Sequence, residues 1–179
     1  MTATANTGTY FLKLAGTLLL IAAVVAGLLG LVNQITAGRI DEINREKTAA
    51  SMQEVLPSQS YDPLDYHGED ATVKAVYRAD GGYVVEVTPS GFGGEIDMVV
   101  GVGDDGSVTG VSIISMSETS GLGANAAKES FRSQYVEKQG VLAVSKDGGE
   151  IDALTGATIT SRAVTRGVNS ALAAAAELG

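Results

Sequence analysis

The sequence contains no cysteine and no tryptophan, and its 179 residues include a single histidine, His67. Without cysteine, the chain forms no disulfide, thiolate zinc site, cysteine-ligated iron–sulfur cluster or thiol nucleophile. One histidine also excludes a multi-histidine metal centre, so we expect no metal site and assign His67 to a solvated loop. Electron transfer by this chain would therefore require an organic cofactor.

Basic residues are scarce compared with acidic ones. The chain has 12 Lys and Arg against 21 Asp and Glu, which gives a formal net charge of -9. Residues 61–179 hold eight basic and seventeen acidic residues, whereas residues 1–60 hold four of each. An acidic surface repels phosphate backbones, so we expect no nucleic-acid partner.

Charge is absent from residues 14–32, which read LAGTLLLIAAVVAGLLGLV and contain one polar residue, Thr17. At 1.5 Å per residue this stretch spans about 28 Å, close to the hydrocarbon thickness of a bilayer. We therefore predict a transmembrane helix over 13–34, after a short tail over 1–12. The run is longer than the apolar part of a signal peptide, and no small-x-small cleavage site follows it, which favours a retained single-span anchor in membrane lipid.

Residues 35–57 predict a stalk helix beyond the membrane. Ile43, Met52 and Val55 fall at helical intervals, and Pro57 ends the pattern. The polar, turn-rich segment 58–70 reads as a linker. We expect the remainder of the chain to form one globular domain over 58–179.

The hydrophobic period then changes to two, which is typical of strands. The predicted strands are 72–79, 82–89, 95–102 and 107–115. The segments DGG, SGFGG and GDDG separate them and supply turn residues, which favours an antiparallel meander.

Helical spacing returns over 124–136 and 161–178, and 141–145 reads as a short strand between them. The expected fold class is α+β, an antiparallel sheet with packed helices, preceded by the transmembrane helix.

Two loops carry the candidate chemistry. The first, SMSETSGLGANA (115–126), places Leu122 between two glycines that allow close approach of a flat ligand, although an ordinary loop before a helix has the same composition. The second, DALTGATITSRAV (152–164), leads into the last helix, which Thr160 or Ser161 could cap. A capping role for Thr160 or Ser161 would leave the hydroxyls of Thr155 and Thr158 without a function.

A helix start favours a phosphate group, which a threonine hydroxyl there could bind or carry as an ester. The second loop contains no histidine, lysine or free amine to activate a threonine, so we expect no catalytic residue.

The two loops resemble a known family. Asp152-x-x-Thr155-Gly156-Ala157-Thr158 is similar to the flavinylation motif of FMN-binding domains in Rnf complexes and in Na⁺-translocating NADH:quinone oxidoreductases. The sequence from Glu118 to Gly123, ETSGLG, resembles the ETPGLG loop of these domains, with Ser120 in the position of the proline. The compact chain looks more like the RnfG family than like the larger NqrC family.

The resemblance implies that the Thr158 hydroxyl carries FMN through a phosphoester bond. An ApbE-like flavin transferase would install it, and the motif residues would form the recognition sequence and surround the phosphate: Asp152, Thr155, Gly156 and Ala157. The isoalloxazine would lie against the first loop, at Glu118, Thr119, Gly121, Leu122 and Gly123.

The resemblance also implies a function: electron relay, without turnover alone, in an ion-translocating ferredoxin:NAD⁺ oxidoreductase. Its partners would be the other membrane and iron–sulfur subunits of the Rnf complex. The flavin domain would lie on the extracytoplasmic side of the bacterial inner membrane, although the count of flanking basic residues slightly favours the opposite orientation. The alternatives are an NqrC-like subunit and a non-redox anchored binding module.

Overall fold

The computed structural model describes residues 4–179 and divides the chain into two compact units, Met1–Arg45 and Glu46–Gly179. Residues 1–3, at the start of the expected tail, lie outside the described residues. The fold is α+β, as the sequence predicts.

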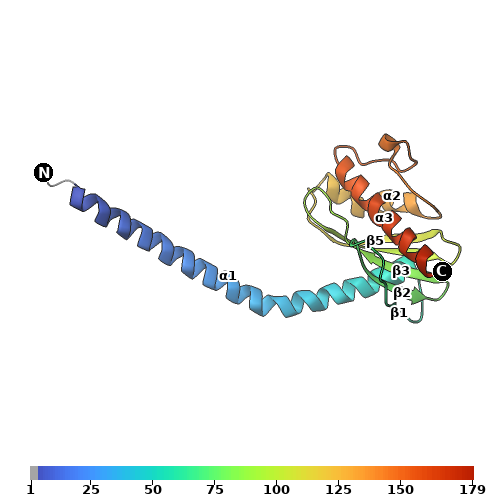
Figure 1. Cartoon of the computed structure of the whole chain (residues 1–179), viewed down its shortest axis with the longest axis horizontal. Coiled ribbons are helices and arrows are strands. Elements are labelled where there is room, and N and C mark those ends of the chain that lie inside the picture. Colours follow the sequence, from blue (N-terminus) through green and yellow to red (C-terminus); the bar gives the residue numbers. More distant parts are fainter. Residues whose placement is uncertain (1–3) are drawn as a thin grey trace. The chain divides into compact units, whose positions relative to one another are not determined.

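The long helix α1 (Thr4–Val55) covers most of the expected tail and both predicted N-terminal helices without a break (Figure 1). Its 52 residues are more than twice the roughly 20 needed to cross a bilayer. It ends at Val55, two residues before Pro57, and the Leu56 amide still donates to the Met52 carbonyl.

Within the described residues, α1 is the one helix that is long and apolar enough to cross a membrane. Its apolar side chains over 14–32 are exposed; Leu19, for example, is 72% exposed and Leu29 65%. In lipid such a surface is favourable, because every backbone polar group of the helix is satisfied internally.

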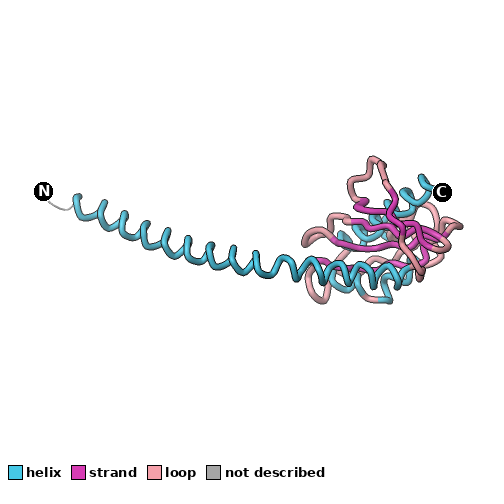
Figure 2. Tube along the Cα trace, turned by 90° about the horizontal axis from the view of Figure 1, so that it is seen from below, coloured by secondary structure: helices cyan, strands magenta, loops and turns pink. Residues whose placement is uncertain are grey.

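One five-stranded antiparallel sheet forms the centre of the second unit, and in Figure 2 its strands lie next to one another in magenta. The strands run in sequence order: β1 (Asp62–Leu64), β2 (Val73–Ala79), β3 (Gly82–Val87), β4 (Ile96–Gly103) and β5 (Val108–Met116). The predicted meander is confirmed, with boundaries within two residues. Strand β1 lies inside the predicted linker; its three residues, one of them Pro63, are too few to show an alternating pattern.

Two elements after the sheet differ from the prediction. The helix expected over 124–136 is divided into η1 (Gly123–Ala127), α2 (Glu129–Arg132) and η2 (Ser133–Tyr135). The division occurs because Lys128 is extended, with φ -73° and ψ 143°. The buried rings of Phe131 and Tyr135, 5.7 Å apart edge to face, then hold the short helices against the sheet.

The prediction of a strand over 141–145 is wrong. Only Val144 pairs, through an isolated bridge to Ile151, and the chain then turns through η3 (Ser145–Asp147). The left-handed Gly148 ends that turn, so the segment folds back on itself instead of continuing as a strand.

The sheet is covered on both faces. Helix α3 (Thr158–Leu178), which begins three residues earlier than expected, packs through Val164 and Val168 on β3 and β4 (Figure 1). On the opposite face, Met52 and Val55 from the end of α1 pack with Val84 and Val99. Alternate residues of the same strands therefore face two different helices.

A pair of glycines makes room for the end of α1. Gly101 and Gly110 are opposite each other in β4 and β5. A Cβ on Gly101 would lie 2.7 Å from the Val55 carbonyl oxygen, and one on Gly110 would lie 2.9 Å from the Val55 Cα. The Thr109 hydroxyl donates to the same carbonyl at 2.7 Å, which fixes where the helix ends.

Candidate functional site

The two loops singled out in the sequence meet in the structure and form one pocket of about 320 Å³. This volume is at the lower end of the range for small-molecule sites. Seven of the predicted site residues line it: Glu118, Thr119, Leu122, Gly123, Gly156, Ala157 and Thr158. Four further residues complete the lining: Phe92, Lys146, Ile159 and Thr160.

The Glu118 carboxylate joins three segments around this pocket. Its Oε1 accepts hydrogen bonds from the backbone amides of Phe92 at 2.7 Å and Gly93 at 3.1 Å. Its Oε2 accepts one from the Thr160 hydroxyl at 2.8 Å. Since both oxygens are engaged by the protein itself, Glu118 supports the walls of the pocket through charge-assisted hydrogen bonds.

Gly123 is required by this same contact. A Cβ at Gly123 would lie 2.5 Å from Glu118 Oε2 and 2.7 Å from Thr160 Oγ1. The sequence suggested that this glycine lets a ligand approach the main chain. In the structure, the space beside it is occupied by the carboxylate and the hydroxyl that connect the two loops.

Helix α3 starts without a side-chain cap. Ala157 is the N-cap residue, and its methyl side chain makes no hydrogen bond to the first-turn amides. The capping role expected of Thr160 or Ser161 is wrong, because both lie inside the first turn and are buried. Ser161 Oγ instead donates to the Ala157 carbonyl and accepts from the Leu154 amide, each at 3.0 Å, which shapes the turn before the helix.

The chain enters α3 through a left-handed residue, Gly156, with φ 77°. A helix start leaves its first amides without intrahelical partners, and they carry partial positive charge. Thr158 is the first helical residue and is half-buried in the pocket. Its hydroxyl therefore lies at a place that favours an anion.

The Thr158 hydroxyl has a cationic neighbour. Lys146 Nζ donates a hydrogen bond to Thr158 Oγ1 at 3.0 Å. Lys146 belongs to η3, the turn that replaces the predicted strand. The second loop itself contains no lysine. The fold brings Lys146, which lies twelve residues before Thr158 in the sequence, next to the threonine.

An ion pair fixes this turn to the helix. Arg162 donates to both carboxylate oxygens of Asp147, from Nε at 2.7 Å and from Nη2 at 2.5 Å. The hydrogen bonds from Arg162, and its charge, lower the pKa of Asp147 below its ordinary value. Because Arg162 lies one helical turn after Thr158, the pair holds Lys146 next to the threonine.

Three predicted residues lie outside the pocket. Asp152 and Thr155 are exposed, and Gly121 is an exposed left-handed residue with open space around its Cα. Asp152 is held by its backbone, whose amide donates to Gln134 Oε1 at 2.7 Å. Asp152 and Thr155 are thus exposed to solvent and do not line the pocket.

Sequence reasoning missed four lining residues. Ile159 and Thr160 belong to the second loop, but Ile159 was given no role and Thr160 only a possible capping role. Phe92 lies in the SGFGG turn, where a phenylalanine among glycines could have been a signal. Lys146 had no signal in the sequence, since only the fold brings it to the second loop.

The pocket suits a flat aromatic group that carries a phosphate. Exposed apolar side chains surround it, namely Phe92, Leu122 and Ile159, which are 70%, 44% and 50% exposed. An uncapped helix start and a lysine lie at its base, around the Thr158 hydroxyl. These donors and apolar surfaces fit an FMN phosphate and ring system.

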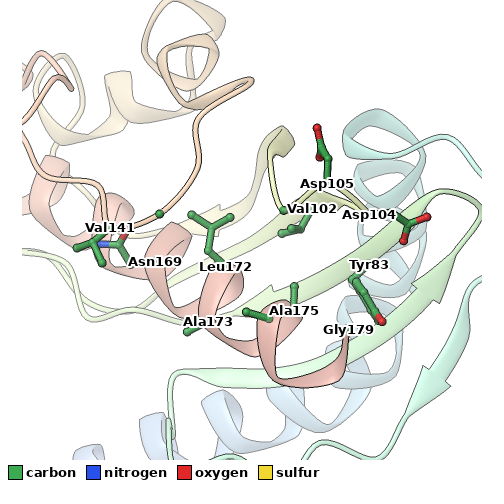
Figure 3. A pocket seen from close by; sticks show the side chains of 14 residues that line it. Tyr83, Val102, Asp104, Asp105, Val141, Asn169, Leu172, Ala173, Ala175 and Gly179 are labelled. Carbon is green, nitrogen blue, oxygen red and sulfur yellow. The ribbon is translucent and has the colours of Figure 1, made fainter.

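A second, larger pocket of about 490 Å³ lies at the C-terminal half of α3 (Figure 3). Apolar residues such as Val102 and Leu172 line it, together with the carboxylates of Asp104 and Asp105. Among the described residues that line it there is no lysine or arginine. Its acidic side would repel a phosphate, so it fits the expected cofactor less well than the smaller pocket.

Two family models match the chain. The RnfG N-terminal region matches residues 8–55, and the FMN-binding domain matches residues 91–173. The second match contains both loops of the pocket and Lys146.

Similar proteins are known from several organisms. The G subunit of the Na⁺-translocating ferredoxin:NAD⁺ oxidoreductase complex of Acetobacterium woodii is 35% identical, and the alignment covers 89% of each chain. The G subunit of the ion-translocating oxidoreductase complex of Pseudomonas aeruginosa is 37% identical over 86% of this chain and 83% of the relative.

A solved structure shares the fold. The crystal structure of the C subunit of Na⁺-translocating NADH-quinone reductase from Parabacteroides distasonis superposes with a TM-score of 0.55. The match covers 78% of this chain and 93% of the other at 18% sequence identity.

Proposed function

Because the chain belongs to the RnfG family, we propose that it is an FMN-carrying electron-transport subunit of an Rnf-type ferredoxin:NAD⁺ oxidoreductase, with FMN bound covalently to Thr158. The family match at both ends of the chain and the relatives from oxidoreductase complexes support the electron-transport role. The covalent attachment is our inference from the resemblance of the second loop to the flavinylation motif, and the pocket around Thr158 supports it.

The position of the Thr158 hydroxyl is the observation that supports Thr158 as the attachment site. It lies at the first residue of an uncapped helix and opens into a pocket with apolar walls. A phosphoester at this oxygen would place its negative charge next to the first amides of α3, which lack intrahelical partners. The hydroxyls of Thr160 and Ser161 are buried and bonded to protein groups, so they are poor alternatives.

FMN supplies the redox chemistry, since it accepts electrons in pairs and releases them singly. The protein residues bind and orient it. Phe92, Leu122 and Ile159 would contact the ring system and exclude water from one side. Glu118 would keep the walls in place through its three hydrogen bonds. The amides at the start of α3 would hold the phosphate.

Maturation requires access by a flavin transferase. In our proposal, an ApbE-like enzyme binds the exposed side chains of Asp152 and Thr155. Gly156 and Ala157 form the turn that exposes Thr158 to this enzyme. The recognition residues and the attachment residue then belong to one short segment, but they have different surroundings.

We propose that α1 anchors the protein as a single span in the bacterial inner membrane, through residues 13–34, with 35–57 as the stalk. The flavin domain, 58–179, would be extracytoplasmic. Its partners would be the other membrane subunits and the iron–sulfur subunits of the complex. The apolar exposed surface of α1 over 14–32 supports the lipid contact.

The experiment is ultraviolet fluorescence of the denatured protein band after expression with a flavin transferase. We expect a fluorescent band for the wild-type chain and for Thr158→Ser, which keeps the hydroxyl, and a dark band for Thr158→Ala. A fluorescent Thr158→Ala band would contradict the attachment site. A dark wild-type band beside a fluorescent control flavoprotein would contradict covalent attachment and favour a non-redox binding module.

An NqrC-like role is a second candidate, because the fold is shared with a component of a quinone reductase. Purification of the intact complex from its native membrane separates the two. Copurified ferredoxin-linked iron–sulfur subunits would support the Rnf assignment, whereas a quinone-reducing set of subunits would support the alternative.

A further inference from the structure

We propose that Lys146 is the phosphate-binding residue of the flavin attachment site and accelerates the transfer of flavin phosphate to Thr158. This inference rests on the proposed function and adds to it a residue from outside the flavinylation motif. The observation that carries it is the 3.0 Å hydrogen bond from Lys146 Nζ to Thr158 Oγ1, the oxygen that would be esterified.

The ammonium group of Lys146 is available for a new anion. Within the described part of the chain, the other lysine of this region, Lys138, is paired with Glu150, and Arg162 is paired with Asp147. No carboxylate among residues 4–179 forms an ion pair with Lys146. A charge-assisted hydrogen bond to phosphate would therefore not have to displace an existing ion pair.

The transfer step shows where the charge is needed. Thr158 Oγ1 would form a bond to the flavin phosphorus of a flavin dinucleotide, and the bond from that phosphorus to the leaving nucleotide would break. The hydroxyl proton would pass to a base of the transferase. Negative charge develops on the phosphate oxygens, which lie two bonds from Oγ1 and within reach of the ammonium group.

Lys146 is also held in position. It is flanked in sequence by Asp147, whose two carboxylate oxygens receive hydrogen bonds from Arg162 on α3. Thr158 and Arg162 are four residues apart and lie on the same side of the helix. The ion pair thus fixes the lysine turn against the helix face that presents the threonine, and Asp147 and Arg162 act as positioning residues.

The test compares initial rates of flavinylation by a purified transferase, measured from in-gel fluorescence over time on the full chain in detergent. Lys146→Met is expected to lower the rate about tenfold to a hundredfold, the loss expected for one charge-assisted hydrogen bond. Lys146→Arg should recover most of the rate. Lys74→Met, which removes an exposed lysine from β2, is the matched control and should label at the wild-type rate.

A second readout separates phosphate binding from folding. The unfolding midpoint of Lys146→Met should equal that of the wild type. In protein loaded to completion, its phosphorus-31 resonance should shift relative to wild type, whereas that of Lys74→Met should not.

Equal labelling rates for wild type and Lys146→Met would overturn the inference, and so would equal, slow rates for Lys146→Met and Lys146→Arg. Neither result contradicts FMN attachment at Thr158, which is tested separately by the fluorescence of the wild-type and Thr158→Ala bands.

Discussion

Oε2 of Glu118 accepts a hydrogen bond of 2.8 Å from Oγ1 of Thr160, and this contact joins the loop after β5 to the first turn of α3. Thr160 is 1% exposed, so the bond is shielded from water. Forty-two residues separate the partners. The pocket therefore depends on a carboxylate that does no cofactor chemistry in our account.

Thr160→Val should destabilise the C-terminal unit, because it removes a buried donor from a carboxylate while the side chain keeps its shape. We expect a loss of about 1.5–3 kcal/mol in the free energy of unfolding, the range for a hydrogen bond to a charged group. Urea denaturation followed by circular dichroism measures it. Thr155→Val, at an exposed position, is the control, and a similar effect at both positions would contradict the role given to the Glu118–Thr160 bond.

Gly123→Ala should also be destabilising. The added methyl group would lie 2.5 Å from Glu118 Oε2 and 2.7 Å from Thr160 Oγ1, so the bond between them must open or the loop must move. Overpacking of this kind costs about 1–3 kcal/mol. Thermal unfolding of Gly123→Ala beside Ala127→Ser, an exposed position in the same turn, tests this. An unchanged midpoint for Gly123→Ala would show that the loop has room that the structure does not.

The end of α1 supplies a pH-dependent contact. Glu54 accepts hydrogen bonds from Ser112 at 2.7 Å and from Arg132 at 2.9 Å. Burial raises the pKa of Glu54, but the bonds from Ser112 and Arg132 and the charge of Arg132 outweigh it, so the pKa lies below its ordinary value of 4.5. A carboxyl with a lowered folded pKa contributes stability above its unfolded pKa and loses it as pH falls through the folded pKa.

Glu54→Gln should therefore destabilise the unit at pH 7 and have a diminishing effect below about pH 4.5. Because Glu54 is half exposed, we expect a difference of about 1 kcal/mol or less. Denaturant unfolding at pH 7 and at pH 3 measures the two differences. A difference between wild type and variant that is as large at pH 3 as at pH 7 would contradict the ionic contribution of this contact.

Asp152 provides a test of transferase recognition. Its side chain is exposed and outside the pocket, so Asp152→Asn should leave the unfolding midpoint unchanged. If the transferase binds this carboxylate, the initial labelling rate should fall about tenfold or more, the loss expected for one charge-assisted hydrogen bond. Asp65→Asn, in the exposed segment between β1 and β2, is the matched control. Equal rates for all three chains would contradict recognition through Asp152.

The sheet and most of the pocket were predictable from the sequence, because both depend on local patterns. The β2–β5 segments are rich in valine and isoleucine and are separated by glycine-containing turns, so their boundaries lie within two residues of the expectation. The two loops were identified by the resemblance of their sequences to the motifs of FMN-binding domains. Strand β1 and the division of the helix after residue 123 were not predictable from the sequence, because tertiary packing rather than periodicity determines them.

The contacts that complete the site could not be predicted in the same way. Lys146 reaches Thr158 only because residues 141–147 turn through η3 instead of forming a strand, and because Arg162 fixes Asp147. Likewise, the sequence offers Thr160 or Ser161 as a helix cap, whereas burial and the bond to Glu118 decide the position of Thr160. Interactions between residues distant in sequence carry no periodic signal.

Peptide mass spectrometry can locate FMN on Thr158 at the level of the single residue. Trypsin cleavage after Lys146 and Arg162 releases residues 147–162, DGGEIDALTGATITSR, from the chain produced with a flavin transferase. We predict that this peptide carries the added mass of FMN, and that fragment ions on either side of Thr158 assign the mass to that residue. An adduct on Thr155, Thr160 or Ser161, or an unmodified peptide when a control flavoprotein is modified, would contradict it.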